Sequence, residues 1–425
     1  MRLRKALAAV AVLGSLSTSL LAVPFAHGPY ACAPGPDTVT ISWSGAPLTA
    51  ATVEYAPLFE YTEREVLPMS LSFVPEGEDV DGEAHVVLEG LLPATDYVYR
   101  VVAHGTDGSD VVSPLGSFST APAPGEPVRF AVLADTQWQW EGINRLELVG
   151  DAIAADTTPF DLILHAGDLV ESPSSSYWDH WFSAFDEMLL RAPFLPVLGN
   201  HERNHRAYYN AFQFPPGEGK AREQWWALHW GDVLIVGLDS TVTGADQYLK
   251  QQAWLKRHLA GSEPHKFVIF HYPVFSSDAY HGEGYNFDVI FHPIFVEHGV
   301  DVVLNGHAHN YERIERDGVT YLVLGGGGAT PRPLAEHRTE GSVVAAEGRH
   351  FYARVATSSD GIDIDVVSVA REEDGIVTPT PDLLLDAFTI TGRSPVGALV
   401  GSLLLIVGVA VGAALLWLLL RARGD

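Results

Sequence analysis

The sequence predicts an all-β module followed by an α/β layered module, and three observations carry this prediction. Residues 37–120 contain short segments of alternating apolar and polar side chains without helical periodicity, which is typical of a β-sandwich. From residue 128 onward, apolar strand-like segments alternate with segments of helical spacing, which indicates an α/β fold. A Pro-rich segment at residues 121–127 separates the two patterns and is typical of a stiff linker.

Composition limits the classes of protein that the chain can belong to. The 425 residues are 47% apolar and 19% charged, so the chain can bury a core and disorder is excluded as its main state. Acidic residues outnumber basic ones by 53 to 26, which argues against a nucleic-acid-binding surface. The single cysteine, Cys32, excludes an intramolecular disulfide and a cysteine-rich zinc site.

Both ends of the chain carry membrane-directed patterns. Residues 1–26 begin with basic residues and continue without charge, which predicts a secretory signal peptide with cleavage after Ala26; an uncleaved signal anchor is the alternative. Residues 396–420 are uncharged and long enough to cross a bilayer, and the tail at 421–425 contains Arg421 and Arg423. The sequence therefore predicts a single-pass type I protein of the cell membrane, with residues of about 27–393 outside the cytoplasm.

The all-β module has its own internal markers. Trp43 lies in the first predicted strand and Tyr97 in a late one, where it is placed for a tyrosine corner. Both are expected to be core residues. The strands are expected at residues 38–44, 52–55, 84–88, 92–101 and 117–120.

The α/β module is expected at residues 128–391. Its helices are predicted at residues 142–155 and 247–259, where apolar side chains recur with helical spacing. Its strands are predicted at residues 128–133, 160–165, 195–198, 233–238, 267–270, 302–304 and 321–324, with closing strands at 362–369 and 387–390.

Polar side chains follow five of these predicted strands, at the point where each strand ends. Ligands of α/β folds lie at the carboxyl ends of the strands, so these side chains are expected to meet at one edge. Each alone is explained by a turn or a helix cap, but together they offer carboxylate, amide and imidazole groups, which are metal ligands. The residues are Asp135, Asp168, Asn200, His271, His307 and His309.

The order of these blocks resembles that of the calcineurin-like metallophosphoesterase superfamily. The blocks are Asp135, Gly167-Asp168, Gly199-Asn200-His201-Glu202, His271 and Gly306-His307-Ala308-His309. The stretch at 306–313, together with a preceding module that resembles a fibronectin type III domain, is similar to purple acid phosphatases. The resemblance spans most of residues 37–391 and implies a four-layer β-sandwich flanked by helices, with a dinuclear metal centre.

The resemblance also implies a role for each matching residue. Asp168 is expected to bridge two metal ions, with Asp135 and His309 on the first and Asn200, His271 and His307 on the second. A metal-bound hydroxide is the implied nucleophile. His201 is expected to contact the substrate phosphate or protonate the leaving oxygen, and His281 to contact the substrate. The alternatives are a structural role for His201 and a solvated loop position for His281; Glu202 is expected to support the ligands.

Two positions depart from the family pattern. Purple acid phosphatases have a tyrosine three residues after the bridging aspartate, where this chain has Glu171, and related enzymes have a histidine where this chain has Gln137. We therefore expect a colourless centre of two divalent Mn, Zn or Fe ions without ferric tyrosinate. Gln137 is expected to bind the first metal through its amide oxygen, or a water fills that place.

The implied activity is hydrolysis of phosphate monoesters, with a phosphorylated small molecule as substrate. A phosphodiesterase or a nucleotide pyrophosphatase on the same centre is an alternative. A surface binding or adhesion module with a degenerate metal site is a third interpretation, which Gln137 and Glu171 favour.

Overall fold

The computed structural model describes residues 25–391, except for 46–48, 76–81, 106–107, 138–144, 220–222 and 282–284. The predicted membrane segment, the tail and all but the last two residues of the predicted signal peptide lie outside the described residues. Within the described ranges, no helix combines the length and the apolar character needed to span a bilayer.

The N-terminal module consists of two antiparallel sheets that pack face to face. Trp43, Val53, Tyr99 and Phe118 are fully or almost fully buried between them. One sheet has the order β1 (His27–Cys32), β2 (Val39–Ser44), β5 (Glu83–Leu88). The other has the order β4 (Met69–Phe73), β3 (Ala51–Pro57), β6 (Asp96–His104), β7 (Asp110–Val112), with β8 (Gly116–Ser119) also paired to β6.

Four elements of this module were not predicted: β1, α1, and the strands β4 and β7, which lie where no strand was expected. Strand β1 lies before residue 37, where the module was expected to begin, and it contains Cys32. A helix, α1 (Leu58–Arg64), occurs where none was expected; it buries no residue and so has no apolar stripe to reveal it. The expected tyrosine corner is present, because the hydroxyl of Tyr97 accepts a hydrogen bond of 2.8 Å from the backbone N–H of Leu92.

The α/β module contains two larger sheets. The six-stranded sheet has the order β11 (Phe194–Pro196), β10 (Leu162–His165), β9 (Arg129–Leu133), β20 (Arg349–Ser358), β21 (Gly361–Glu373), β22 (Ile376–Thr391). The eight-stranded sheet has the order β12 (Gly217–Glu218), β13 (Trp225–Trp230), β14 (Val233–Gly237), β15 (His265–Ile269), β16 (Val302–Asn305), β18 (Val319–Leu324), β17 (Tyr311–Arg316), β19 (Ser342–Ala346).

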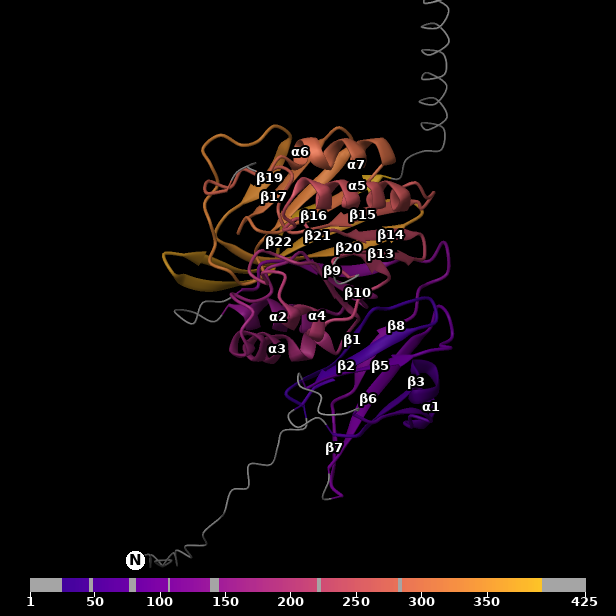
Figure 1. Ribbon diagram of the computed structural model, residues 1–425. Helices are drawn as coiled ribbons and strands as arrows, with labels where there is room; N and C mark the ends of the chain where they lie inside the picture. The colour runs from indigo at the N-terminus through magenta and orange to yellow at the C-terminus, as the bar shows by residue number, and fades with distance from the viewer. Residues whose placement is uncertain are drawn as a thin grey trace, which may run out of the picture.

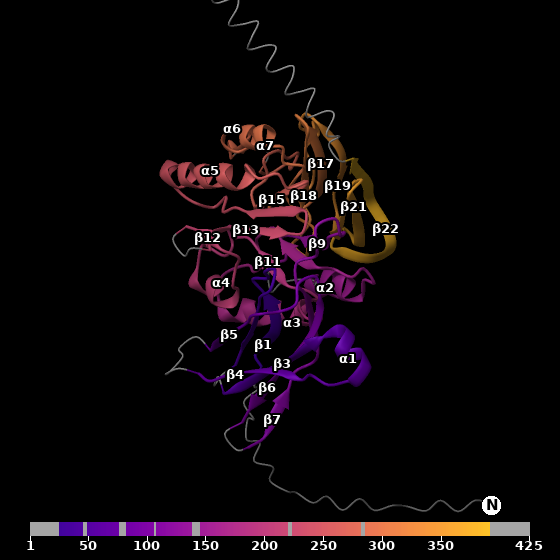
Figure 2. The same ribbon diagram turned by 90° about the vertical axis from the view of Figure 1, so that its right-hand side faces the viewer.

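Helices cover the outer face of each large sheet, so that the module has four layers (Figures 1 and 2). Phe130 and Phe267 pack edge to face between the two sheets, with ring centroids 5.1 Å apart. On the side of the six-stranded sheet lie α2 (Leu146–Ala155), α3 (Ser175–Leu189) and α4 (Arg206–Ala211); on the other side lie α5 (Ala245–Leu259), α6 (Phe287–Ile290) and α7 (His292–His298). The chain thus has the mixed α/β sandwich that the sequence predicts.

Strand β1 fixes the N-terminal module to the outer helices of the α/β module. The ring of His27 stacks on Phe182 of α3 with centroids 4.3 Å apart, and its Nε2 lies 2.8 Å from Asp179 Oδ1. The buried hydroxyl of Tyr30 donates to the carbonyl of Ala211 in α4. These contacts join the two modules through packed aromatic side chains as well as through the linker.

Candidate metal centre

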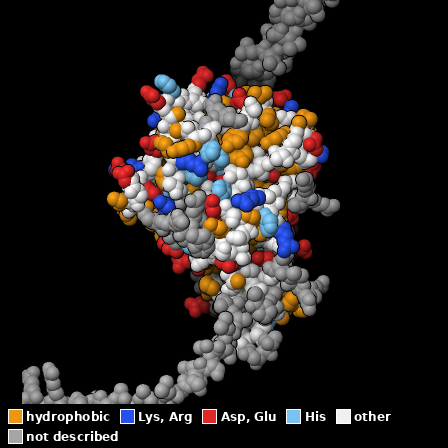
Figure 3. Space-filling model, turned by 60° about the vertical axis from the view of Figure 1, so that its left-hand side comes forward, with side chains coloured by type: hydrophobic (Ala, Val, Ile, Leu, Met, Phe, Trp, Pro, Cys, Tyr) orange, Lys and Arg blue, Asp and Glu red, His pale blue; other side chains and the backbone are white. Residues whose placement is uncertain are grey.

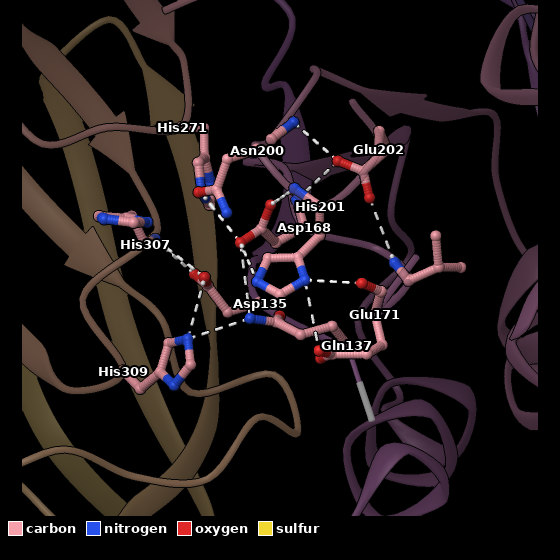
Figure 4. A network of polar contacts seen from close by, with 12 residues as sticks. Asp135, Gln137, Asp168, Glu171, Asn200, His201, Glu202, His271, His307 and His309 are labelled. Carbon is pink, nitrogen blue, oxygen red and sulfur yellow. Dashed lines mark hydrogen bonds and ion pairs between the residues drawn. The ribbon is translucent and has the colours of Figure 1, made fainter. Parts of the chain in front are cut away.

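The six predicted ligands meet at one edge of the α/β sandwich, as Figure 4 shows. Strands β9, β10 and β11 run parallel, as do β14, β15, β16 and β18, so the loops that follow them emerge on the same side. Asp135, Asp168 and His271 are at most 1% exposed, and His307 and His309 are each 6% exposed. The structure therefore places these side chains in a buried polar cluster.

Three acceptor atoms converge around His271. Its Nδ1 lies 3.0 Å from the carbonyl oxygen of Ala166, which fixes the ring proton there. Its Nε2 then presents a lone pair, yet it lies 3.1 Å from Asp168 Oδ2 and 3.0 Å from Asn200 Oδ1. These facing lone pairs require a cation between them, which is a proton on Nε2 in the metal-free protein or a metal ion in its place.

The electrostatics of this cluster favour positive charge. Burial lowers the pKa of His271, but the Asp168 carboxylate outweighs burial and raises the pKa to about 9. Burial raises the pKa of Asp168, whereas His271 lowers it well below its usual range, and the second effect prevails. Asp168, His271 and His307 each offer a ligand atom, and these atoms all lie within 4.8 Å of one another.

His307 is oriented by Tyr285, which was not among the predicted site residues. The hydroxyl of Tyr285 lies 2.7 Å from His307 Nε2, which leaves Nδ1 for a metal. Tyr285 stacks on Tyr272 with ring centroids 4.2 Å apart. Burial and the neighbouring His271 hold the pKa of His307 far below its usual value, so the ring is neutral, as a ligand must be. The one signal in the sequence is indirect: Tyr272, on which Tyr285 stacks, directly follows the predicted ligand His271.

Asp135, His309 and Gln137 form the first of the two predicted ligand groups. His309 Nδ1 lies 2.8 Å from the carbonyl of Thr330, and its Nε2 lies 3.5 Å from Asp135 Oδ1. Gln137 is buried, with its Nε2 3.1 Å from His309 Nε2 and its Oε1 without a hydrogen-bond partner. Rotating the amide by 180° places Oε1 toward Asp168 and His309, which the nitrogen now faces, so the residues present fit a metal ion.

Three of the predicted ligands have a left-handed backbone conformation. Asp135, Asp168 and His307 have φ angles of 58°, 58° and 69°, which cost about 1–3 kcal/mol each in residues other than glycine. The neighbouring chain approaches too closely for a side chain: a Cβ on Gly199 would lie 2.1 Å from Asp168 Oδ1, and one on Gly306 2.6 Å from Asp135 Oδ2. The two glycines are therefore required by the packing of the carboxylates.

His201 and His281 are half-buried and lie next to the cluster. His201 Nδ1 is 2.7 Å from the carbonyl of Glu171, which turns Nε2 toward Asp168 Oδ2 at 3.8 Å. Burial lowers the pKa of His201, but Asp168 and Glu171 outweigh it and raise the pKa above its usual value. The His281 ring lies 4.3 Å from that of His307, measured between centroids. Both histidines are thus close enough to the predicted metal ligands to contact a molecule bound at the centre.

Two hollows flank the cluster. One, of about 420 Å³, is lined on the side of the first group by Gln137, His201, His309 and Arg332. The other, of about 310 Å³, is lined by Asn200, Tyr272 and polar side chains of the loops around them. On the face shown in Figure 3, His side chains (pale blue) lie close to Lys or Arg side chains (blue) near the middle, while most Asp and Glu side chains (red) lie nearer the outline. Arg332 is a candidate binding residue that sequence reasoning missed.

Comparison with known proteins assigns the α/β module. Residues 128–311 match the family model of the calcineurin-like phosphoesterases, a range that contains all six predicted ligands. The chain carries a calcineurin-like phosphoesterase domain. The predicted resemblance to this superfamily and to purple acid phosphatases is thereby confirmed.

Relatives of this phosphoesterase domain include purple acid phosphatases. Purple acid phosphatase 15 of Arabidopsis thaliana is 26% identical over 295 residues, which cover 60% of this chain and 55% of that protein. The chain thus spans about half the length of this curated relative. A purple acid phosphatase from yellow lupin (Lupinus luteus) seeds has the same fold, with a TM-score of 0.69 at 18% identity over 87% of this chain and 75% of that chain. The structure of PhoD gives 0.68 at 13% identity, over 88% of this chain and 93% of that chain.

Proposed function

We propose that the protein is a metal-dependent hydrolase of phosphate monoesters with two divalent ions, Mn, Zn or Fe, in the centre. The observation that carries this proposal is the meeting of Asp168 Oδ2, Asn200 Oδ1 and His271 Nε2 within hydrogen-bond distance, with the His271 proton directed at Ala166. The match of residues 128–311 to the calcineurin-like phosphoesterases supports the reaction class.

The chain supplies a rigid set of ligands for this reaction. Asp168 lies between the two groups, because it approaches His271 at 3.1 Å and Gln137 at 3.5 Å. Asp135 and His309 lie on one side of Asp168. Asn200, His271 and His307 lie on its other side. Two metal ions, when bound, would neutralise the phosphate oxygens and lower the pKa of a water nucleophile. Glu171 stands where ferric enzymes have tyrosine, which supports a colourless centre.

His201 is suited to deliver a proton to the leaving oxygen. Its ring is held by the Glu171 carbonyl, is 25% exposed, and has a raised pKa, which favours the form that carries a proton on Nε2. His281 lies next to His307, where it can contact the phosphate. Asp278 accepts the backbone N–H of His281 at 2.8 Å and so holds that residue in place.

Metal analysis combined with a phosphoester panel tests the proposal. We expect between one and two bound metal ions per chain, hydrolysis of p-nitrophenyl phosphate, and at least a hundredfold loss of activity in Asp168→Asn and His307→Ala. Asp186→Asn, an exposed carboxylate on α3, is the matched control. Less than one ion per chain and no hydrolysis after loading with Mn or Zn would favour a binding module with a degenerate site.

A phosphodiesterase or nucleotide pyrophosphatase is the second candidate activity. The observation that favours it is the second hollow beside Asn200 and Tyr272, because an ester group on each side of the phosphorus requires space on both sides of the centre. Turnover of bis(p-nitrophenyl) phosphate equal to that of the monoester would select this candidate.

We propose further that the N-terminal module is of the fibronectin type III kind and that the protein is anchored in the cell membrane with its catalytic domain outside. The first point is supported by the packing of a three-stranded sheet against a five-stranded sheet and by the tyrosine corner at Tyr97. The uncharged residues 396–420 followed by Arg421 and Arg423 support the second. Protease protection of the chain in intact cells tests the orientation.

A further inference from the structure

Two arginines, Arg145 and Arg332, line the 420 Å³ hollow beside Asp135 and His309. They differ in whether a carboxylate neutralises their charge. Arg145 forms a two-pronged pair with Glu372, at 2.6 Å from Nε and 2.6 Å from Nη2. Its side chain and that of Glu372 are 9% and 7% exposed, so this charge is neutralised within the fold. Arg332 has no carboxylate within 4.0 Å among the residues that the structure describes.

Arg332 is held close to the ligands by its backbone. Its N–H donates to the carbonyl of His309 at 2.9 Å, and its Nη1 lies 3.5 Å from the carbonyl of His307. The guanidinium therefore lies over the turn that carries these two histidines, on the wall of the same hollow as His201. Glu171 also lines this hollow, but its carboxylate is 3.6 Å from His201 Nδ1, which partly compensates it.

An arginine of this kind is suited to bind an anion. Its planar fork binds a carboxylate or a phosphate through two hydrogen bonds, and it remains charged at every physiological pH. The chain as a whole carries a net charge of -27. A cation without a carboxylate partner on this wall therefore makes the local electrostatic potential more positive than that of the acidic protein as a whole. The reacting phosphate is bound by the metal centre and does not need Arg332. The leaving part of the substrate lies toward His201, its proposed proton donor, and thus on the same wall as Arg332.

We propose that Arg332 determines specificity by binding an anionic group on the leaving part of the substrate. The preferred substrates are then phosphate monoesters whose organic part carries a carboxylate or a further phosphate. This inference rests on the proposed function and narrows its substrate class.

A matched pair of substrates, phenyl phosphate and 4-carboxyphenyl phosphate, tests the inference on the metal-loaded protein. We expect the wild-type protein to prefer the carboxylated ester in kcat/KM by roughly tenfold or more, as for a charge-assisted pair. Arg332→Gln should lower kcat/KM for the carboxylated ester much more than for phenyl phosphate, so that most of this preference is lost. Arg338→Gln removes the same charge from an exposed position six residues further along the same loop and should leave the preference intact. Equal losses on both esters would instead place Arg332 on the reacting phosphate and overturn the inference, as would an unchanged preference.

Binding separates this inference from the proposed function. Calorimetric titration with phenylphosphonate and 4-carboxyphenylphosphonate, which are not hydrolysed, should show the same preference and the same dependence on Arg332. A phenyl ester with a phosphonate in place of the carboxylate shows which anion is bound more tightly. Absence of hydrolysis with an Arg332-dependent binding preference would refute the phosphatase and keep the anion site; hydrolysis without any preference would refute the anion site and keep the phosphatase.

Discussion

The backbone N–H of Asp168 donates a hydrogen bond of 3.0 Å to Oε2 of Glu202, so a residue two positions after Asn200 holds the loop that carries Asp168. The same oxygen accepts the N–H of Gly199 at 2.7 Å, and Oε1 accepts those of Leu169 and Val170 at 2.7 and 3.2 Å. One buried carboxylate thus joins the loops after β10 and β11. Burial, together with Asp168, raises the pKa of Glu202 to about 7, and the backbone donors oppose this shift.

We expect Glu202→Gln to loosen both loops, because an amide offers one acceptor oxygen where the carboxylate offers two. The free energy of unfolding should fall by about 2 kcal/mol or more, and metal affinity by about 10–100-fold. Urea unfolding of the metal-free protein and competition with a chelator measure the two effects. Glu187→Gln, on the exposed face of α3, is the control. Unchanged stability and affinity would show that the four hydrogen bonds do not position the ligands.

Gln137 is the residue whose role the family pattern leaves open. Because its Oε1 is buried without a partner, we expect Gln137→Ala to weaken binding of one of the two ions by about 10–100-fold, with less effect on the other. Gln137→His supplies an imidazole nitrogen and should preserve binding of both ions. Stepwise metal titration followed by elemental analysis distinguishes the ions. Two-ion binding that is equally tight in the alanine variant would mean that water, not Gln137, completes the site.

The proposed proton transfer from His201 predicts a dependence on the leaving group. His201→Ala should reduce kcat by roughly 100-fold or more for phenyl phosphate, whose leaving oxygen needs a proton, and much less for p-nitrophenyl phosphate. The metal content should not change, since the structure gives His201 no position among the ligands. Equal losses on the two esters would assign His201 to phosphate binding instead.

Asp161 predicts a pH-dependent stability that is independent of the metal centre. Burial raises its pKa from 3.8 to about 6, and the N–H of Arg129, which donates to its Oδ2 at 2.6 Å, opposes the shift only partly. The folded state therefore binds the proton more tightly than the unfolded state, and this group's contribution to stability falls as the pH rises from about 4 to 6. Asp161→Asn mimics the protonated form. Its stability relative to the wild-type protein should increase by about 2–3 kcal/mol between pH 4 and 7, as measured by urea unfolding. A difference that is constant with pH would contradict this prediction.

The positions of the ligands were predictable because a short apolar strand followed by a polar residue is visible in a sequence, as before Asp135 and His307. The left-handed backbone at these two residues was not predictable, since it results from close packing between loops that are distant in the chain. Tyr285 and Arg332 were missed for the same reason: each reaches the histidine turn across the fold and has no motif of its own. Helix α1 was missed because it buries no side chain.

Strand β22 gives the folded region a defined direction of resistance to force. Thr391 pairs with Gly361 and Ile376 with Glu373, so the hairpin of β21 and β22 is hydrogen-bonded from one end to the other, with two register shifts. A pull on residue 391 along the strand therefore loads these bonds in parallel, as shear, whereas a pull across the strand opens them one after another. Because β21 pairs with β20 and β20 with β9, tension applied at this end is distributed into the sheet that carries Asp135.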